Sequence, residues 1–211
     1  MIKESNYVSE LNPKNEIDTL IEYATTEAVP IMDKISVEFV KQLLRIHNAH
    51  NVLEIGTAIG YSALHFASVH PNIQITTIER NELMYQQAKK NIQDFNKQHQ
   101  INLVFKDALE AFDEVNHQIY DVLFIDAAKA QSKKFFELYS PLVRTGGLII
   151  TDNILYHDFV GNIEIVRSRN VKQMVRKIEK YNTWLSENTD YQTNFIDIGD
   201  GMSISIKLKG E

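Results

Sequence analysis

The stretch of residues 120–153 restricts the possible fold more than any other part of this chain. It contains two apolar runs, 122–125 and 148–150, with a helix-like segment between them, and each run is followed by a carboxylate, Asp126 or Asp152. Continuous apolar runs joined through a helix are typical of neighbouring parallel strands that are buried on both faces. The sequence therefore predicts two strands of one parallel sheet with an acidic residue at the carboxyl end of each.

Three oxygen-bearing side chains would lie at this edge of the sheet, where parallel α/β folds bind their ligands. They are Asp126, Asp152 and Asn153. Hard oxygen donors without sulfur or imidazole fit Mg²⁺, or another divalent cation such as Mn²⁺ or Ca²⁺. Consecutive strand residues point to opposite faces, so Asp152 and Asn153 can share an ion only if the chain leaves the strand there. The alternatives are a helix cap at Asp126 and a turn residue at Asn153.

Length and composition predict one domain spanning residues 1–211. Hydrophobic residues make up 44% of the chain and charged residues 24%, as in ordinary globular proteins. The absence of cysteine excludes disulfides, thiolate nucleophiles and cysteine zinc sites. We expect a cytoplasmic protein, since no apolar run is long enough for a leader or a membrane span. A net charge of −6 argues against general nucleic-acid binding.

Hydrophobic periodicity divides the chain into a helical N-terminal cover, residues 1–50, and a core, residues 51–211. In the cover, Asn12 and Pro13 are expected to begin a helix. In the core, five strand–helix units predict an α/β, doubly wound, Rossmann-like sheet that is mostly parallel. A helix is expected over 108–115 and another over 166–187. Alternating residues around Gly199-Asp200-Gly201 then predict a C-terminal hairpin, which adds one antiparallel strand.

The turn after the first strand reads Glu54-Ile55-Gly56-Thr57-Ala58-Ile59-Gly60. Glycines here let a ligand approach the backbone, but the dinucleotide and phosphate-loop patterns are both absent. An acidic residue in the turn would repel a pyrophosphate and suits a cationic cofactor. Glu79 ends the second strand, where a carboxylate commonly accepts hydrogen bonds from a ribose, and Asp107 ends the third, near the expected adenine. Singly, the glycines could serve packing, Glu79 could be a solvated strand end and Asp107 a helix cap.

In combination these features resemble the class I S-adenosylmethionine-dependent methyltransferases. With Asp-Ala-Ala-Lys at 126–129 and Thr-Asp-Asn at 151–153, the chain is similar to the metal-dependent O-methyltransferase family, which includes catechol and caffeoyl-CoA O-methyltransferases. The resemblance implies a divalent metal on Asp126, Asp152 and Asn153, and Lys129 as general base beside the catalytic Asp126. It implies that S-adenosylmethionine contacts Met32, Glu54, Gly56, Thr57, Ser62, Glu79, Asp107, Ala108 and Asp126.

The acceptor is less constrained. Residues 167–180 hold six basic side chains and one acidic one, a plausible phosphate-binding track or simply a solvated helix face: Arg167, Arg169, Lys172, Arg176, Lys177, Lys180 and Glu179. Several segments look similar to the bacterial tRNA 5-hydroxyuridine methyltransferase branch of the family. That branch implies methylation of wobble 5-hydroxyuridine to 5-methoxyuridine, with the tRNA anticodon loop bound through Arg167, Arg169, Lys172 and Arg176.

Two other functions stay open. One is methylation of a small catechol or phenylpropanoid, although animal catechol enzymes have a tryptophan where this chain has Ala128, so one wall of a small-ring pocket is missing. The other is a non-catalytic S-adenosylmethionine-binding protein, against which the intact set of Asp126, Asp152, Asn153 and Lys129 argues. The family is commonly dimeric, so we expect a homodimer. His157 is expected near the mouth of the site.

Overall fold

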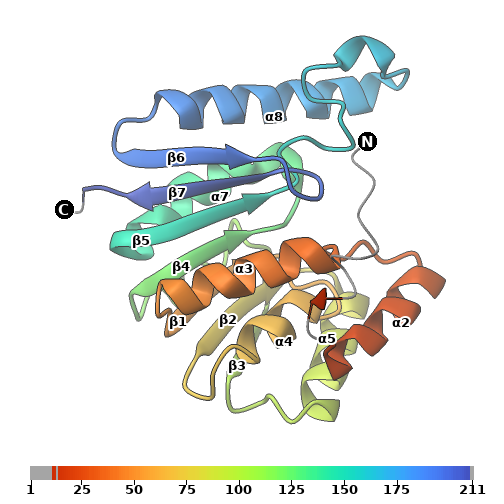
Figure 1. Ribbon diagram of the computed structural model, residues 1–211, viewed down its shortest axis with the longest axis vertical. Coiled ribbons are helices and arrows are strands. Elements are labelled where there is room, and N and C mark those ends of the chain that lie inside the picture. The colour runs from red at the N-terminus through yellow and green to blue at the C-terminus, as the bar shows by residue number, and fades with distance from the viewer. Residues whose placement is uncertain (1–10, 13, 210–211) are drawn as a thin grey trace.

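The structure is a computed structural model that describes residues 11, 12 and 14–209. Its helices and strands, in chain order, are η1 (Glu16–Thr19), α2 (Leu20–Thr26), α3 (Lys34–Ile46), β1 (Asn51–Ile55), α4 (Tyr61–Ala67), β2 (Gln74–Glu79), α5 (Glu82–Asp94), β3 (Ile101–Phe105), α6 (Phe112–Val115), β4 (Tyr120–Ile125), η2 (Lys129–Gln131), α7 (Ser132–Tyr139), η3 (Ser140–Leu142), β5 (Val143–Asp152), η4 (Ile163–Ile165), α8 (Arg169–Glu187), β6 (Tyr191–Ile196) and β7 (Met202–Lys207). Here η denotes a 3₁₀ helix. Figure 1 shows their arrangement.

The strands form one sheet in the order β3-β2-β1-β4-β5-β7-β6. The pairs among β1 to β5 are parallel, and β7 runs antiparallel to both β5 and β6. This confirms the predicted doubly wound sheet with a C-terminal hairpin. The strand order reverses between β1 and β4, and ligands of open α/β sheets bind at the carboxyl ends of the strands beside such a reversal. The topology alone thus places a crevice next to the residues that follow β1 and β4.

Helices cover both faces of the sheet because its central strands are apolar on both sides. Val52 and Phe124 pack with α3 and α4 on one face, whereas Leu53 and Leu123 pack with α7 and α8 on the other. All four side chains are fully buried. In Figure 1, α3 and α4 lie in front of the sheet. Helix α8 runs along β6 at the top of the view, with β7 on the other side of β6. The continuous apolar runs of the sequence correspond to strands buried on both faces.

The N-terminal cover differs in detail from the prediction. Asn15, not Asn12, caps the first described helical segment, with its side chain accepting from the backbone N–H of Ile17 at 3.0 Å. Pro13 lies outside the described residues. Helix α3 begins at Lys34 after the cap residue Asp33 and packs its apolar side on the sheet. The segment before α3 is not helical, and this segment reaches the site described below.

Two predicted helices begin later than expected. Helix α6 covers only Phe112–Val115, because Asp107 forms a local turn by accepting from the N–H of Leu109. Helix α8 begins at Arg169, after the cap residue Ser168, so Arg167 lies ahead of it. None of the helices in the described ranges is long and apolar enough to cross a membrane.

At the amino ends of the strands, Asp121 joins three segments of the chain. Its carboxylate accepts from the N–H of His50 at 2.7 Å, the N–H of Asn51 at 2.9 Å and Nε of Arg144 at 2.7 Å. Partial burial opposes ionisation of Asp121, but the hydrogen bonds from Arg144, Asn51 and His50 outweigh it and hold the pKa of Asp121 below its usual value. The charged form of this residue therefore stabilises the junction of β1, β4 and β5.

We expect Asp121→Ala to lower the free energy of unfolding at pH 7 by about 2 kcal/mol, because two backbone donors and a guanidinium lose a charged partner. A carboxyl with a lowered folded-state pKa contributes stability above its unfolded pKa and loses it as the pH falls through the folded pKa. The difference from wild type should therefore shrink below about pH 4. Urea unfolding between pH 3 and 7 measures this. The exposed Asp94→Ala is the control, and equal effects of the two variants would contradict the assignment.

Candidate active site

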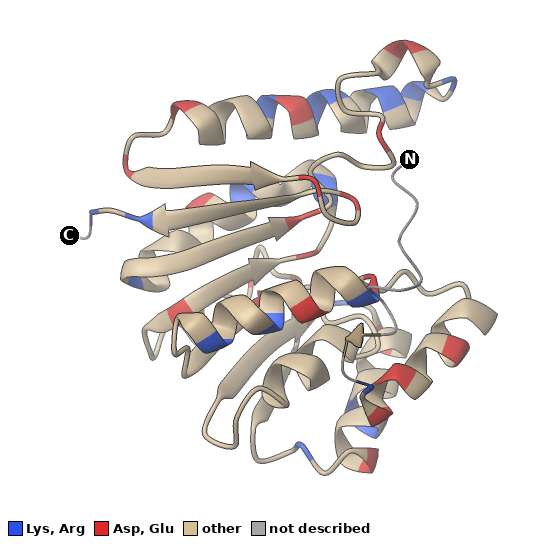
Figure 2. Ribbon diagram, in the orientation of Figure 1, with Lys and Arg blue, Asp and Glu red and all other residues tan. Residues whose placement is uncertain are grey.

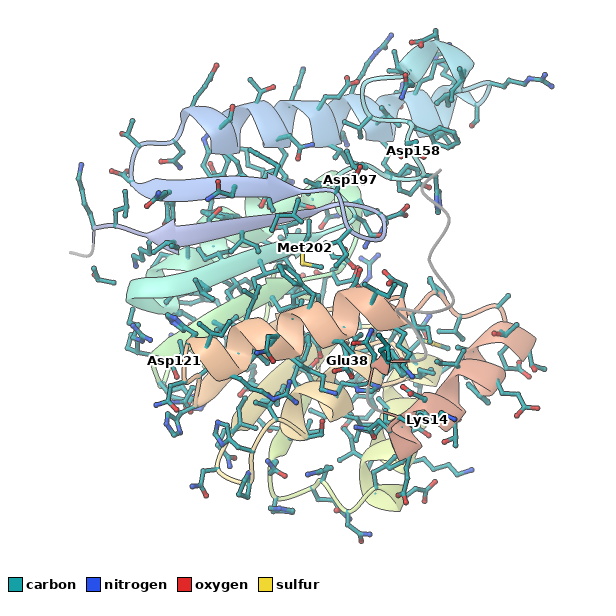
Figure 3. The ribbon with its side chains drawn as sticks, viewed as in Figure 1. Lys14, Glu38, Asp121, Asp158, Asp197 and Met202 are labelled. Atoms are coloured by element: carbon teal, nitrogen blue, oxygen red, sulfur yellow. The ribbon has the colours of Figure 1, made fainter. Side chains whose placement is uncertain are left out.

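A cavity of about 1110 Å³ opens at the carboxyl ends of β1, β2 and β4. Its walls come from residues 30–33 and 35 before and at the start of α3, the turns after β1 to β5 with the first residues of α4, Phe135 of α7, residue 174 of α8 and the hairpin turn 197–200. Figure 3 shows Asp158 and Asp197 at this end of the molecule, and Asp121 at the opposite end of the strands. The cavity thus occupies the crevice that the strand order predicts.

The turn between β1 and α4 forms the cavity floor and requires glycine. Gly56 has φ +103°, and a Cβ there would overlap the backbone carbonyl of Asp126. Only a residue without a side chain lets β1 and β4 approach so closely at this point. Gly60, with φ +84°, begins α4 beside Ala88. Thr57 lines the cavity and its hydroxyl lies 2.6 Å from that of Thr77.

Glu54 lies under this turn rather than on the cavity wall. It is fully buried, and its two carboxylate oxygens accept from Ser62 Oγ and Thr77 Oγ1, each at 2.5 Å. Burial raises the pKa of Glu54 to about 7, against the lowering effect of those two hydrogen bonds. Of these two predicted cofactor contacts, Ser62 lines the cavity and Glu54 lies behind it, joined to it by a hydrogen bond.

Glu79 and Asp107 both reach the cavity wall, as the strand ends predict. Glu79 accepts from the N–H groups of Ala58 at 2.9 Å, Arg80 at 2.9 Å and Asn81 at 2.7 Å. Asp107 accepts from the N–H of Leu109 at 2.9 Å and from Arg80 at 3.0 Å, and these bonds lower its pKa despite some desolvation. Backbone N–H groups thus orient each carboxylate on the cavity wall.

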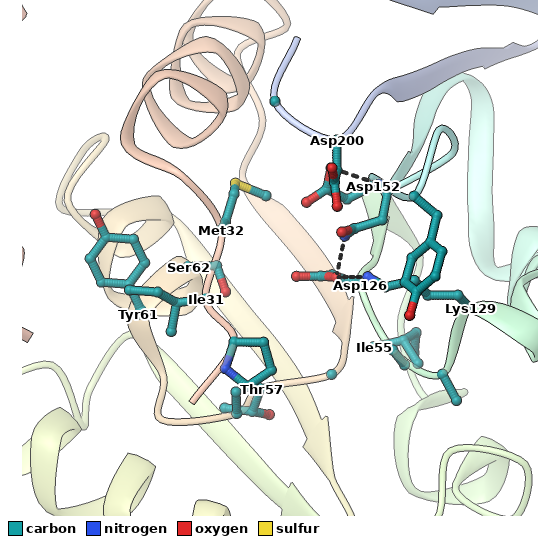
Figure 4. Close-up of a pocket in the computed structure, with 18 of the residues that line it drawn as sticks. Ile31, Met32, Ile55, Thr57, Tyr61, Ser62, Asp126, Lys129, Asp152 and Asp200 are labelled. Atoms are coloured by element: carbon teal, nitrogen blue, oxygen red, sulfur yellow. Dashed lines mark hydrogen bonds and ion pairs between the residues drawn. The ribbon is translucent and has the colours of Figure 1, made fainter. Parts of the chain in front are cut away.

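The cavity wall also has apolar positions at Met32 and Ala108. Met32 is 6% exposed and Ala108 8%, and both line the cavity. Figure 4 shows Met32 and Ser62 on one side of the pocket, facing Asp126, Asp152 and Lys129 on the other. An elongated ligand along the floor would lie between these two sides.

Asp126, Asp152 and Asn153 converge at one place on the wall. Asn153 donates from Nδ2 to Asp126 Oδ1 at 3.0 Å, and its backbone N–H donates to Asp152 Oδ1 at 2.8 Å. Strand β5 ends at Asp152, and Asn153 adopts φ +64°, in the left-handed region. The chain therefore leaves the strand between the two residues, which is the condition for both to face the same point.

The carboxyl groups of Asp126 and Asp152 lie in a partly buried place where ionisation is unfavourable. Burial raises the pKa of Asp126 to about 6, Lys129 opposes the shift, and the charges of Glu54 and Asp200 add to it. Burial and the charge of Asp126 raise the pKa of Asp152 to about 8. A divalent cation would relieve both effects. The available donors are hard oxygens. Two are carboxylates, and a flip of the Asn153 carboxamide, which now donates from Nδ2 to Asp126, would turn its oxygen to the same place. The set therefore fits Mg²⁺ or a similar ion.

Lys129 begins the short helix η2 and lies beside the carboxylates. Its Nζ is 3.9 Å from Asp126 Oδ1 and 6.0 Å from the ring centre of Tyr156, and its side chain is 26% exposed. The amino group of Lys129 is therefore accessible both from the cavity and from solvent. This places an amine next to any acceptor that the carboxylates and a cation would hold.

Several cavity residues were not predicted from the sequence. Asp33, Tyr156, Met174, Asp197 and Asp200 all line the cavity. In the sequence, Met174 is one of the apolar residues spaced along α8, and Asp200 is a turn residue of the hairpin. Neither position by itself indicates a functional role. His157, expected near the mouth, does line the cavity.

The predicted basic track lies beside the cavity, not in it. Arg167, Arg169 and Arg176 are exposed and Lys172 is half-buried, and the cavity wall contains none of them. Figure 2 shows basic residues gathered in the half of α8 nearer the carboxyl ends of the strands. No acidic residue occupies the first turn of α8, where the helix dipole would favour one. This half of the helix presents positive charge close to the opening.

Gly56→Ala is expected to destabilise the fold by about 1–3 kcal/mol, because it adds backbone strain and a steric overlap with Asp126. Gly161→Ala is a matched control, since Gly161 also has a positive φ but has nothing within 4 Å of an added Cβ. Thermal unfolding of the two variants measures the difference. Equal melting temperatures would show that the close approach of β1 and β4 carries no energetic weight.

Comparison with known proteins agrees with this geometry. The family model described as O-methyltransferase matches residues 7–208. A caffeoyl-CoA O-methyltransferase from Populus kitakamiensis is 30% identical over 176 residues, covering 81% of this chain and 75% of that protein. The solved structure of a Staphylococcus aureus protein named "putative caffeoyl-CoA O-methyltransferase" is 52% identical with a TM-score of 0.93, covering 96% of this chain and 98% of the other.

A Bacillus cereus O-methyltransferase, solved in complex with SAH, shares the fold with a TM-score of 0.83 at 23% identity, covering 96% of each chain. The family model spans nearly the whole sequence, including the turn after β1 and the carboxylates after β4 and β5. The chain therefore belongs to the O-methyltransferase family.

Proposed function

We propose that this chain transfers a methyl group from S-adenosylmethionine to one of two adjacent oxygens on a planar acceptor, with a divalent cation at Asp126, Asp152 and Asn153. The supporting observation is the convergence of these three side chains on the wall of the cavity that Thr57, Ser62, Glu79 and Asp107 also line. Donor and acceptor would thus share one enclosure, which favours reaction by fixing their relative orientation.

The residues divide into a donor side and an acceptor side. On the donor side, Glu79 would accept from the ribose hydroxyls, Asp107 and Ala108 would face the adenine, and the buried charge of Glu54 favours a cationic sulfonium cofactor. On the acceptor side, a divalent cation would place positive charge beside the two acceptor oxygens and favour ionisation of the attacking hydroxyl.

The reaction would then be a single displacement. The acceptor oxygen forms a bond to the methyl carbon, the carbon–sulfur bond breaks, and the sulfur keeps the electron pair. The hydroxyl proton would pass to Nζ of Lys129 as the general base; this atom lies 3.9 Å from Asp126 Oδ1, and the side chain is exposed enough to pass the proton on to solvent.

The names of the relatives favour a catechol-like acceptor such as a phenylpropanoid, because caffeoyl-CoA carries two adjacent phenolic hydroxyls. A second candidate is 5-hydroxyuridine at the wobble position of tRNA, whose 5-hydroxyl lies next to the 4-carbonyl. The basic half of α8 beside the opening favours it, since binding of a polyanion needs such a surface (Figure 2). Both acceptors would use the same metal-site residues, so the test that separates them is the contribution of the basic half of α8.

We expect Asp152→Ala to lower kcat by about 10³-fold or more, because several kcal/mol of charge stabilisation at the reacting oxygen are lost. Binding of S-adenosylhomocysteine, measured by calorimetry, should change by less than about threefold, since Asp152 lies on the acceptor side. Asp190→Ala, at the far end of the hairpin, is the control. Turnover near the wild-type rate in Asp152→Ala would disprove the metal-assisted mechanism.

The double variant Arg169→Glu/Arg176→Glu separates the two acceptors. If tRNA is the acceptor, its KM should rise about tenfold or more and the salt dependence of activity should weaken. If a catechol is the acceptor, its kinetics should be nearly unchanged. Lys89→Glu/Lys90→Glu on α5 is the charge-matched control. The assay is methylation of caffeic acid and of tRNA carrying 5-hydroxyuridine, with mass spectrometry of the products. An unchanged KM for tRNA in this variant would show that the basic residues of α8 are only a solvated helix face.

A further inference from the structure

The loop that follows β5 is held in an unfavourable backbone conformation. Asn153, Tyr156, His157 and Asp158 have φ values of +64°, +46°, +55° and +59°. Asparagine and aspartate tolerate this region, but tyrosine and histidine do so at a cost of about 1 kcal/mol each. Such conformations persist only where surrounding contacts fix them, and they cluster at functional sites.

The β6–β7 hairpin supplies several of the contacts that fix this loop, and Asn182 of α8 adds one by donating to the carbonyl of Ile154 at 3.0 Å. The N–H of Ile154 donates to the carbonyl of Gly201 at 3.0 Å, and the N–H of Leu155 to the carbonyl of Asp200 at 2.9 Å. The side chain of Asp200 accepts from the N–H of His157 at 3.1 Å, and its other oxygen lies 3.2 Å from Nδ1 of the same residue. One carboxylate therefore holds both the backbone and the ring of His157.

The hairpin turn is itself seated firmly. A Cβ on Gly199 would overlap the Asp33 side chain and lie 2.5 Å from Ser36 Oγ, and a Cβ on Gly201 would overlap Leu155. The turn thus packs between the start of α3 and the loop after β5. Because His157 is 64% exposed, water weakens the contact of its ring with Asp200, and the backbone hydrogen bonds carry most of the restraint.

We propose that Asp200 is a positioning residue for the acceptor: by fixing loop 153–158, it sets where the amide of Asn153 and the ring of Tyr156 stand on the cavity wall. Both residues line the cavity, and Tyr156 lies over Lys129. In Figure 4, Asp200 lies next to Asp152 and opposite Met32, between the hairpin and the carboxylates. The hairpin thereby acts on the acceptor side through the loop after β5.

This inference rests on the proposed function, and Asp200→Ala tests it. We expect kcat/KM for the acceptor to fall about 10- to 100-fold, mainly through KM, because displacement of the loop by about 1 Å misplaces the acceptor. Binding of S-adenosylhomocysteine should change by less than about twofold, since none of its expected contacts moves. Amide hydrogen exchange of residues 154–157 should accelerate in the variant, with α4 and α5 unchanged.

Matched variants separate positioning from a general loss of structure. Asp200→Asn keeps an oxygen for the N–H of His157 and should restore kcat/KM to within about threefold of wild type. His157→Asn tolerates a positive φ and should be active, whereas His157→Val, whose branched side chain disfavours that region, should resemble Asp200→Ala. Asp190→Ala is the control at the other end of the hairpin.

The outcomes are distinguishable. If the wild-type chain methylates caffeic acid or tRNA and Asp200→Ala leaves KM for that acceptor unchanged, the positioning role is wrong and the proposed function stands. An equal loss of S-adenosylhomocysteine binding in Asp200→Ala would also overturn it, because the defect would then be general. If the wild-type chain methylates neither acceptor, the proposed function fails. Unchanged hydrogen exchange at 154–157 in Asp200→Ala would then reject the restraint independently of activity.

Discussion

The close approach of the turn after β1 to the backbone after β4 is the contact on which the site depends. Gly56 makes it possible, since any side chain at that position would overlap the carbonyl of Asp126. The N–H of Asp126 in turn donates to the carbonyl of Ile55 at 3.0 Å. This contact joins the two halves of a doubly wound sheet where their strand order reverses. As a result the donor-side floor and the acceptor-side carboxylates belong to one cavity.

Buried negative charge is the second feature that organises the site. Glu54, Asp126 and Asp152 all have raised pKa values, and burial is the main cause in each case. Glu54 is fully buried and Asp126 and Asp152 are half-buried, and a carboxylate withdrawn from water is unfavourable when ionised without a partner. Positive ligands remove that penalty. The cationic sulfonium of the proposed donor and a divalent cation are complementary to these charges.

The acceptor side depends on parts of the chain that are far apart in sequence. The loop after β5 carries Asn153 and Tyr156, and the β6–β7 hairpin restrains it through Asp200. Helix α8 contributes Met174 to the wall, and its basic residues gather in the half nearer the carboxyl ends of the strands. Variation in these C-terminal elements could change the acceptor while the donor floor stays the same, since the two sides share only the strand ends.

The sequence alone determined the sheet, because apolar runs and turn residues act locally and strand burial follows from them. It also determined the edge at which Asp126, Asp152 and Asn153 lie, since the carboxyl ends of parallel strands share one edge. The starts of α6 and α8 and the cap at Asn15 differed from the prediction. Several residues near each helix start can accept a backbone hydrogen bond, here Asp107, Ser168 and Asn15, and the sequence does not show which of them will do so.

Only the tertiary structure decided which side chains face the cavity. Glu54 is adjacent to the glycine turn in sequence, yet it is not part of the cavity wall, because it is fully buried and bonded to Ser62 and Thr77. Asp200 reads as a turn residue, and its hydrogen bond to His157 spans 43 positions. Such contacts arise from packing between elements, and no local pattern encodes them.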